Sequence, residues 1–221
     1  NDPAFFLKKQ AVAAVLGIIA MIIVSKIDYR VLIKKMPIIR ITPATLLFCI
    51  AIVLQVVVLF IGSEVNGARR WLNLGPIGFQ PSEVTKVAVI VFTSYVIYLT
   101  PLMLDRMSGY IKVMIYMALP IGLVLKENLS TAIVLFFIAT GICFIASRKK
   151  LYYVFSLVAG SLAGVLIIVF GKGFRGARIE SWLNVETHEK GYQTLQGLYA
   201  IASGGFFGSG LGKKKKKLGF I

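Results

Sequence analysis

Between two long apolar runs the chain carries the stretch Asn66-Gly-Ala-Arg-Arg-Trp-Leu-Asn-Leu-Gly-Pro-Ile-Gly-Phe-Gln-Pro-Ser-Glu-Val-Thr-Lys86. This stretch predicts a loop at a membrane surface and a new helix that begins at Pro81. Its adjacent arginines suit phosphate, because a planar guanidinium donates paired hydrogen bonds. Glu83 and Lys86 would share one face of the new helix, inside the apolar zone. The stretch therefore indicates a membrane protein that handles an anionic, lipid-linked substrate.

The composition is that of an integral membrane protein. Of the 221 residues, 57% are hydrophobic and only 15% are charged, whereas a soluble domain carries about 25% charged residues. The formal net charge is +16, and it falls to +11 without the block Lys213–Lys217. Because the basic residues mostly flank apolar runs, the expected partners are anionic lipid headgroups or phosphorylated lipids, and not nucleic acid. Cys49 and Cys143 lie within apolar runs and predict small buried hydrophobic residues, not a disulfide or a metal pair.

The distribution of apolar residues predicts an all-α integral membrane protein, a polytopic helical bundle. A spanning helix needs about 17–25 residues, and strand alternation is absent. Residues 1–171 are assigned to the bundle, and residues 172–221 to a large outer loop that is too polar to span. The six apolar segments run near Ala4–Val24, Thr42–Ile61, Pro81–Leu99, Tyr110–Leu125, Ser130–Ala146 and Leu151–Phe170.

Basic residues in the short loops predict the orientation of the bundle. The Ser25–Ile41 loop holds five lysines and arginines, the loop 147–150 is Ser-Arg-Lys-Lys, and Arg106 lies in a third loop. All three loops fall on one side, which the positive-inside rule assigns to the cytoplasm. The Gly62–Gln80 loop and the polar tail then lie outside. Arginines in these outer segments run against the usual bias, which favours an anionic ligand there.

Each candidate residue in the quoted stretch also has a structural interpretation. Arg70 and Trp71 would serve as a headgroup contact and an interfacial anchor, with no chemistry. Glu83 and Lys86 would form an internal ion pair near the start of their helix. A charge at membrane depth costs on the order of 2.5–3.5 kcal/mol, so such residues usually face a cavity or a partner.

Three further polar features lie outside that stretch. Arg175 and Arg178, three residues apart in the tail, would bind phosphate or pair with nearby glutamates. The segment Lys126–Thr131 would be a simple polar turn between two spans. His188, the single histidine, has few candidate ligands around it, so a solvated loop position is preferred to a metal site.

The motifs Gly67-Ala-Arg-Arg-Trp71 and Gln80-Pro-Ser-Glu-Val-Thr-Lys86 closely resemble the SEDS family (shape, elongation, division and sporulation). That family includes the FtsW, RodA and SpoVE proteins. Ser25–Arg30 resembles the first cytoplasmic loop of the family. Gly191–Gln193 and Gly208–Gly212 resemble parts of its large outer loop. The resemblance covers nearly the whole chain, with the motifs in the family's order.

The resemblance implies a peptidoglycan glycosyltransferase that polymerises lipid II, the undecaprenyl-pyrophosphate-linked disaccharide pentapeptide. The implied location is the bacterial cytoplasmic membrane, with the active face extracytoplasmic and a class B penicillin-binding protein as partner. No cofactor is implied. Whether a divalent cation assists stays open, although nothing indicates one. The role in division, elongation or sporulation stays open. Two other classes of function stay open as well: a lipid II flippase, and a non-catalytic scaffold for the penicillin-binding protein.

The resemblance also implies roles for individual residues. Glu83 and Lys86 would support catalysis by lining the cavity. Pyrophosphate contacts would come from Arg70, Arg175 and Arg178. Trp71 would pack against sugar or lipid, and Gln193 would hold the outer loop in place.

Departures from the family pattern affect the catalytic base. The family has ten spans, and this chain resembles the second to seventh with most of the outer loop. The essential aspartate of the Pro-Glu-Ala-His-Thr-Asp segment has no counterpart here, and Lys213–Lys217 stands where that segment would precede Leu218–Ile221. Asn128 occupies a position where the family has an acid. We therefore expect no catalytic residue in this chain and no activity from it alone.

Overall fold

The computed structural model describes residues 5–37, 40–65, 68–74, 77–170, 180–186, 191–206 and 208. The chain divides into two compact units. Tyr29–Ile167 forms one unit, and Asn1–Asp28 together with Ile168–Ile221 forms the other. The predicted boundary between bundle and outer loop, at residues 171 and 172, lies outside the described residues.

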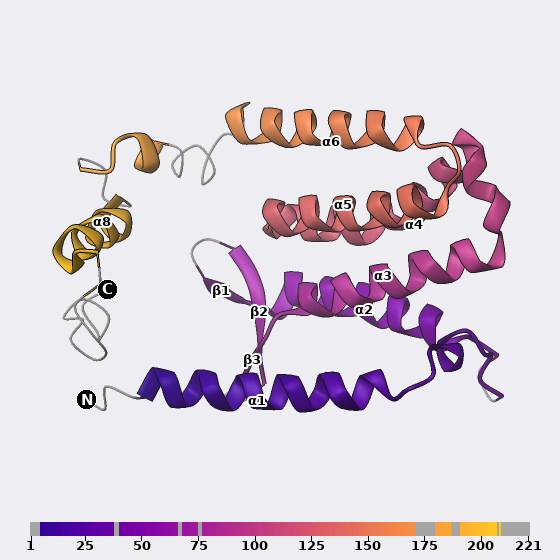
Figure 1. Cartoon of the computed structure of the whole chain (residues 1–221), viewed down its shortest axis with the longest axis horizontal. Coiled ribbons are helices and arrows are strands. Elements are labelled where there is room, and N and C mark those ends of the chain that lie inside the picture. Colours follow the sequence, from indigo (N-terminus) through magenta and orange to yellow (C-terminus); the bar gives the residue numbers. More distant parts are fainter. Residues whose placement is uncertain are drawn as a thin grey trace. The chain divides into compact units, whose positions relative to one another are not determined.

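Helices form at all six predicted apolar segments, so the predicted helical membrane fold is confirmed. Within the described residues, the first five are long and apolar enough to span a membrane, and Leu151–Ile167 is a shorter apolar helix. The helices are α1 (Phe5–Ser25), α2 (Pro43–Ile61), α3 (Pro81–Leu99), α4 (Met107–Glu127), α5 (Leu129–Ala146) and α6 (Leu151–Phe170). Figure 1 shows α2, α3, α4 and α5 lying side by side.

Local sequence accounts for where the helices begin. Thr42 caps α2, because its side-chain oxygen accepts a hydrogen bond from the Thr45 backbone nitrogen at 3.3 Å, and Pro43 follows at the first helical position. Pro81 likewise occupies the first helical position of α3, where the sequence predicted that the helix begins. A proline is favourable there because the first turn leaves its backbone nitrogen without an intrahelical partner.

The hydrophobic core of the Tyr29–Ile167 unit comes mainly from α4 and α5, and α3 contributes Val89 to it. The buried face of α3 is made of small and hydroxyl side chains, among them Ser82, Thr85, Ala88 and Thr93. Such a face lets helices approach closely and hydrogen-bond across the interface. One such hydrogen bond joins α2 to α3: Gln55 Nε2 donates to Thr85 Oγ1 at 2.9 Å, in a buried position.

We expect Thr85→Val to lower the free energy of unfolding by about 1–2 kcal/mol. The substitution keeps the side-chain shape but leaves the buried Gln55 amide without its oxygen acceptor. SDS titration of the purified protein in mixed micelles measures the change. The double variant Gln55→Leu/Thr85→Val removes both partners of the hydrogen bond. We therefore expect its free energy of unfolding to lie close to that of the wild type. Equal stability of Thr85→Val and the wild type would show that the bond contributes nothing.

The start of α6 is held to the short 3-10 helix η2 (Pro101–Asp105). Tyr153 is fully buried, and its hydroxyl donates to the Leu104 backbone oxygen at 2.7 Å. Ser147 Oγ donates to the same oxygen at 3.1 Å. Further along α6, a Cβ on Gly160 would lie 2.2 Å from the ring of Phe136 in α5. Glycine at this position therefore allows the two helices to pack closely.

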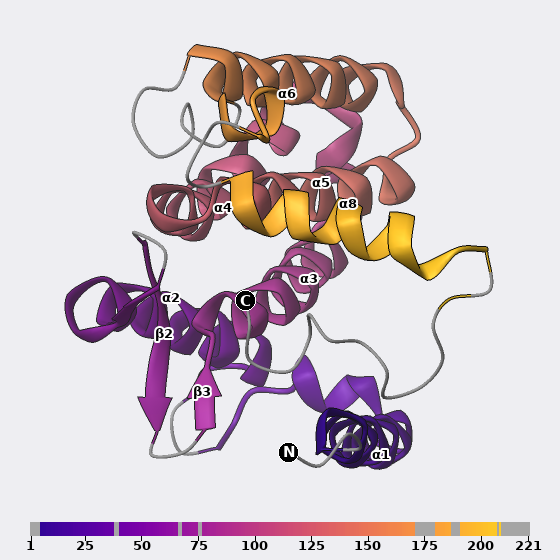
Figure 2. The same ribbon diagram turned by 90° about the vertical axis from the view of Figure 1, so that its left-hand side faces the viewer.

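The Gly62–Gln80 loop, which the sequence predicted only as a loop at the membrane surface, folds into a small antiparallel sheet. The order is β1 (Ser63–Val65), β2 (Ala68–Leu74) and β3 (Ile77–Phe79), and Figure 2 shows β2 and β3 side by side. Leu72 pairs with Phe79 and Val65 with Ala68. Strands of three to seven residues are too short to show the alternation by which strands are detected in a sequence. The sheet is stabilised by β2 contacts with α2, α3 and α4.

The other unit contains α1, whose apolar side chains are exposed along the described part of the helix. Its tail contains a second helix, α8 (Tyr192–Gly204).

In the Tyr29–Ile167 unit the two cysteines differ in burial: Cys143 of α5 is buried as predicted, but Cys49 of α2 is exposed. An apolar run alone does not determine which face of its helix packs inward.

Candidate functional site

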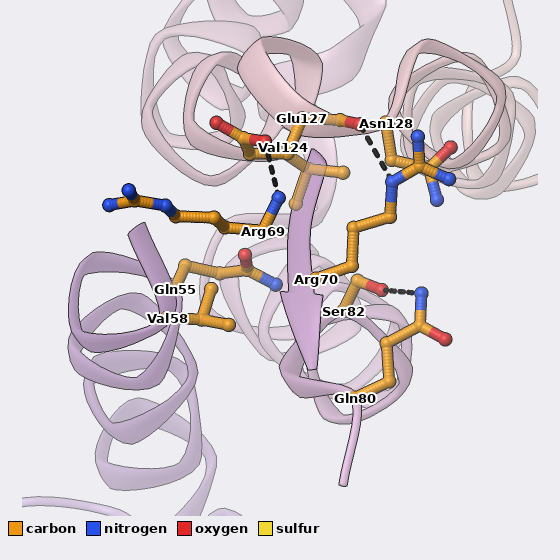
Figure 3. A pocket seen from close by; sticks show the side chains of 9 residues that line it. All are labelled: Gln55, Val58, Arg69, Arg70, Gln80, Ser82, Val124, Glu127 and Asn128. Atoms are coloured by element: carbon orange, nitrogen blue, oxygen red, sulfur yellow. Dashed lines mark hydrogen bonds between the residues drawn. The ribbon is translucent and has the colours of Figure 1, made fainter. Parts of the chain in front are cut away.

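A small polar pocket lies where the sheet meets the ends of α2, α3 and α4 (Figure 3). Its volume is about 230 Å³, counting space open to solvent. Seven of its nine lining residues carry a polar or charged side chain, although the helices beneath them are strongly apolar. The lining residues are Gln55, Val58, Arg69, Arg70, Gln80, Ser82, Val124, Glu127 and Asn128.

Glu127 fastens the sheet to the end of α4. The Arg69 backbone nitrogen donates to Glu127 Oε2 at 2.8 Å. Arg70 Nε donates to the Glu127 backbone oxygen at 2.9 Å. Hydrogen bonds with an ionised partner are about twice as strong as neutral ones. Two consecutive arginines of β2 are thus held by one residue at the end of the helix.

Strand alternation separates the two arginine side chains. Figure 3 shows them leaving β2 in opposite directions. Arg69 Nε lies 3.9 Å from Glu64 Oε2, and both side chains are about half exposed, at 49% and 60%. An exposed pair of this kind contributes about 0–1 kcal/mol. Arg70, Ala68 and Leu72 are the more buried side chains of β2, so Arg70 supplies the inward-facing guanidinium.

The turn between α4 and α5 forms the far wall of the pocket. Asn128 Oδ1 accepts a hydrogen bond from the Thr131 backbone nitrogen at 3.2 Å, which makes Asn128 the N-cap of α5. Asparagine is among the best N-cap residues. The polar segment Lys126–Thr131 is thus a turn, as its structural interpretation predicted, and it also lines the pocket through Glu127 and Asn128.

The family model FTSW_RODA_SPOVE, described as "Cell cycle protein", matches residues 1–221. The chain belongs to the FtsW/RodA/SpoVE family. A protein of Trichlorobacter lovleyi named "Probable peptidoglycan glycosyltransferase FtsW" is 32% identical over the whole chain, which covers 57% of that relative. A protein of the same name from Legionella pneumophila is also 32% identical, with 55% of its length covered. The chain spans about half the length of these curated relatives.

Solved structures agree with this family membership. The crystal structure of Thermus thermophilus rod shape determining protein RodA matches with a TM-score of 0.56 and 26% identity, over 71% of this chain and 50% of that one. A structure titled "Structural coordination of polymerization and crosslinking by a peptidoglycan synthase complex" matches with a TM-score of 0.63 over 88% of this chain and 56% of that one. Its 24% identity supports the fold alone.

In this FtsW/RodA/SpoVE family member, Glu83 and Lys86 form an ion pair on α3. Lys86 Nζ lies 2.7 Å from Glu83 Oε2, and the side chains are 32% and 58% exposed. The ion pair of the structural interpretation is therefore present. Neither residue lines the pocket, because Ser82 and Thr85 occupy the buried face of α3.

Trp71 lies on the other side of β2 from Arg70. Its side chain is 37% exposed and rests against β3, where a Cβ on Gly78 would lie 3.3 Å from the indole ring. Ser63 Oγ donates to the Trp71 backbone oxygen at 3.1 Å. Trp71 is thus placed for contact with groups outside the pocket.

The remaining predicted site residues fall outside the described part of the molecule. Arg175 and Arg178 lie in the undescribed range 171–179, and Lys213–Lys217 in the range 209–221. Gln193 belongs to α8, but its side chain is not described. Among the residues that are described, no three His, Cys, Asp or Glu side chains gather as they would around a metal ion.

Four of the polar residues that line the pocket were not singled out from the sequence: Gln55, Gln80, Ser82 and Glu127. Gln55 could have been recognised as a candidate site residue from the sequence. It is an amide within the apolar run of α2, and polar residues at membrane depth usually serve a function. Glu127 lay in a segment that was interpreted as a turn. Its contacts with β2 join residues 57 and 58 positions apart, which no local pattern predicts.

Proposed function

We propose that the full-length protein is a peptidoglycan glycosyltransferase that polymerises lipid II at the outer face of the bacterial cytoplasmic membrane. The observation that carries the proposal is the inward-facing Arg70 guanidinium, held by Glu127 at 2.9 Å in a polar pocket at one end of the bundle. The two relatives named "Probable peptidoglycan glycosyltransferase FtsW" support the same reaction class.

The pocket is too small to enclose a whole substrate. Its free volume is about 10 Å³, which is roughly the room that one water molecule needs and far below the roughly 300–1,000 Å³ of ligand sites that enclose a drug-sized molecule. A phosphate group would therefore meet the Arg70 guanidinium at the mouth of the pocket. The contact through Nε fixes the plane of the Arg70 guanidinium, and a fixed guanidinium is well suited to phosphate oxygens. We assign the pocket to the pyrophosphate of a lipid-linked sugar, while the glycan lies outside it.

The proposed reaction joins the 4-hydroxyl oxygen of one lipid II to the anomeric carbon of the growing strand. The bond from that carbon to the pyrophosphate breaks, and undecaprenyl pyrophosphate leaves with the electron pair. A carboxylate accepts the hydroxyl proton, and cations stabilise the charge that develops on the leaving group. We assign the cationic role to Arg70, Arg175 and Arg178. No residue of this chain is assigned as the base.

Four other residues receive supporting roles in the proposal. Glu83 and Lys86, paired at 2.7 Å, would position the base or the acceptor from the exposed face of α3. Trp71, on the outer side of β2, would pack against sugar or lipid. Gln193 would hold the outer loop. A class B penicillin-binding protein is the proposed partner, as the resemblance to the SEDS family implies.

Incubation of the full-length protein with labelled lipid II tests the proposed reaction, with and without a class B penicillin-binding protein. We expect ladders of lengthened glycan on a gel. Glu83→Ala should abolish them, because Glu83 is assigned to position the base or the acceptor. Glu64→Ala should retain them, because Glu64 has no role in the proposed reaction and pairs only weakly with Arg69 at the surface. If no pairing yields ladders and labelled lipid II instead exchanges between leaflets, the protein is a transporter and the proposal fails.

A further inference from the structure

A second cavity lies at the opposite end of α4 from the Arg70 pocket. Its volume is about 540 Å³, counting space open to solvent, and residues of η2 and of the first turns of α4 line it. The lining consists of two apolar residues, one glycine, one hydroxyl side chain and two cations: Leu102, Met103, Gly109, Ser108, Arg106 and Lys112. No acidic residue contributes to it.

The two cations of this cavity are available to an anion. Arg106 and Lys112 are both exposed, and within the described residues neither is in an ion pair with a carboxylate. The nearest acid along the chain, Asp105, is engaged elsewhere, since its Oδ1 accepts a hydrogen bond from the Arg148 backbone nitrogen at 3.1 Å. Ser108 and Lys112 lie four residues apart on α4, so they face the same side of the helix.

Close backbone packing forms the cavity floor. A Cβ on Gly109 would lie 1.9 Å from the Met103 backbone oxygen, so only glycine lets η2 approach the first turn of α4 this closely. The Gly109 backbone nitrogen donates to the Arg106 backbone oxygen at 3.0 Å, which closes the turn. The partial positive charge of the α4 N-terminus adds to the field of Arg106 and Lys112.

Exposed apolar residues neighbour the two cations along the chain. Leu102 is 66% exposed, Met107 45% and Ile111 48%. Cations beside exposed apolar groups at the end of a membrane-spanning helix fit an amphiphile, whose phosphate meets the charges while its acyl chains meet the apolar groups. Basic pockets of this kind on the cytoplasmic side of membrane proteins bind anionic headgroups.

We propose that this cavity binds the phosphate group of an anionic ligand, with Arg106 and Lys112 as its charged contacts. The exposed Leu102, Met107 and Ile111 favour a phospholipid headgroup over a soluble phosphate as the source. The site is separate from the Arg70 pocket, and its occupancy does not depend on the proposed glycosyltransferase reaction.

Native mass spectrometry of the full-length protein in neutral detergent tests this site. The probes are phosphatidylglycerol, zwitterionic phosphatidylcholine, and inorganic phosphate as a competitor. We expect phosphatidylglycerol to bind the wild type, and the double variant Arg106→Gln/Lys112→Gln to bind it about 30-fold more weakly. The matched control Lys34→Gln/Lys35→Gln removes the same charge from two other exposed residues and should bind like the wild type.

The competitor distinguishes the two sources of phosphate. If inorganic phosphate at millimolar concentration displaces phosphatidylglycerol, the site takes a soluble phosphate; if it does not, the site is selective for the lipid. Both results support a phosphate site. Equal binding of phosphatidylglycerol and phosphatidylcholine, equal binding by the wild type and the double variant, an equal loss in the lysine control, or no binding at all would overturn the proposal.

Discussion

Replacing Arg70 with alanine in the full-length protein should lower the initial rate of lipid II polymerisation about 100-fold. Loss of one preorganised donor to a developing negative charge costs about 100- to 1,000-fold in comparable sites. Arg70 is the inward-facing guanidinium of β2, and its contact with the Glu127 backbone oxygen at 2.9 Å holds it in place before substrate arrives. The rate is measured from labelled glycan formed over time at saturating lipid II.

The neighbouring arginine provides the matched control. Arg69→Ala removes the same charge from the same strand, but its side chain leaves β2 on the opposite side (Figure 3). The contact with Glu127 at 2.8 Å comes from the Arg69 backbone nitrogen, which alanine retains. We therefore expect Arg69→Ala to lower the rate less than about threefold, consistent with a weak exposed ion pair. Equal losses in the two variants would show that only the total charge of the loop matters.

Replacing Glu127 with leucine should lower the polymerisation rate about tenfold. The carboxylate accepts a hydrogen bond from the Arg69 backbone nitrogen, and a charged hydrogen bond contributes about 1.5–3 kcal/mol. Without it, β2 is less firmly held at the end of α4, and the neighbouring Arg70 loses its fixed position. Glu127 is thus a positioning residue in the proposed reaction, and initial rates of polymerisation measure its effect.

The conservative variant separates positioning from charge. Glu127→Gln retains a side-chain oxygen that accepts from the Arg69 nitrogen, so we expect it to restore the rate to within about threefold of the wild type. Both variants keep the backbone oxygen that accepts from Arg70 Nε. If Glu127→Gln is as slow as Glu127→Leu, the charge of Glu127 acts directly and the positioning role is wrong.

The helices could be predicted from the sequence because their signals are local. Apolar runs of spanning length and the proline at position 81 are each contained in a few turns of chain. The spacing of Glu83 and Lys86 predicted that they share a face, and the structure pairs them. Burial of a given side chain is not local. Cys49 and Cys143 both lie in apolar runs, yet only Cys143 is buried.

The candidate site could be predicted only in part, for the same physical reason. The quoted stretch contained Arg70, Gln80 and Ser82, but the sheet that orients Arg70 is stabilised by contacts with three helices. Glu127 contacts Arg69 and Arg70 of β2, which lie 58 and 57 positions before it in the sequence. Gln55 approaches Thr85 across 30 residues. Contacts of this range depend on how the helices pack, and a single sequence carries no pattern for them.

The most direct test of the account is the affinity of the full-length protein for a fluorescent analogue of undecaprenyl pyrophosphate. Binding requires no catalytic base, so it isolates the role assigned to the Arg70 pocket. We predict that Arg70→Ala binds the analogue at least about tenfold more weakly than the wild type. Arg69 also lines the pocket, but its side chain leaves β2 on the opposite side (Figure 3), so we predict that Arg69→Ala weakens binding by less than about threefold. Equal affinity of the wild type and a correctly folded Arg70→Ala variant would contradict the assignment of this pocket to the pyrophosphate.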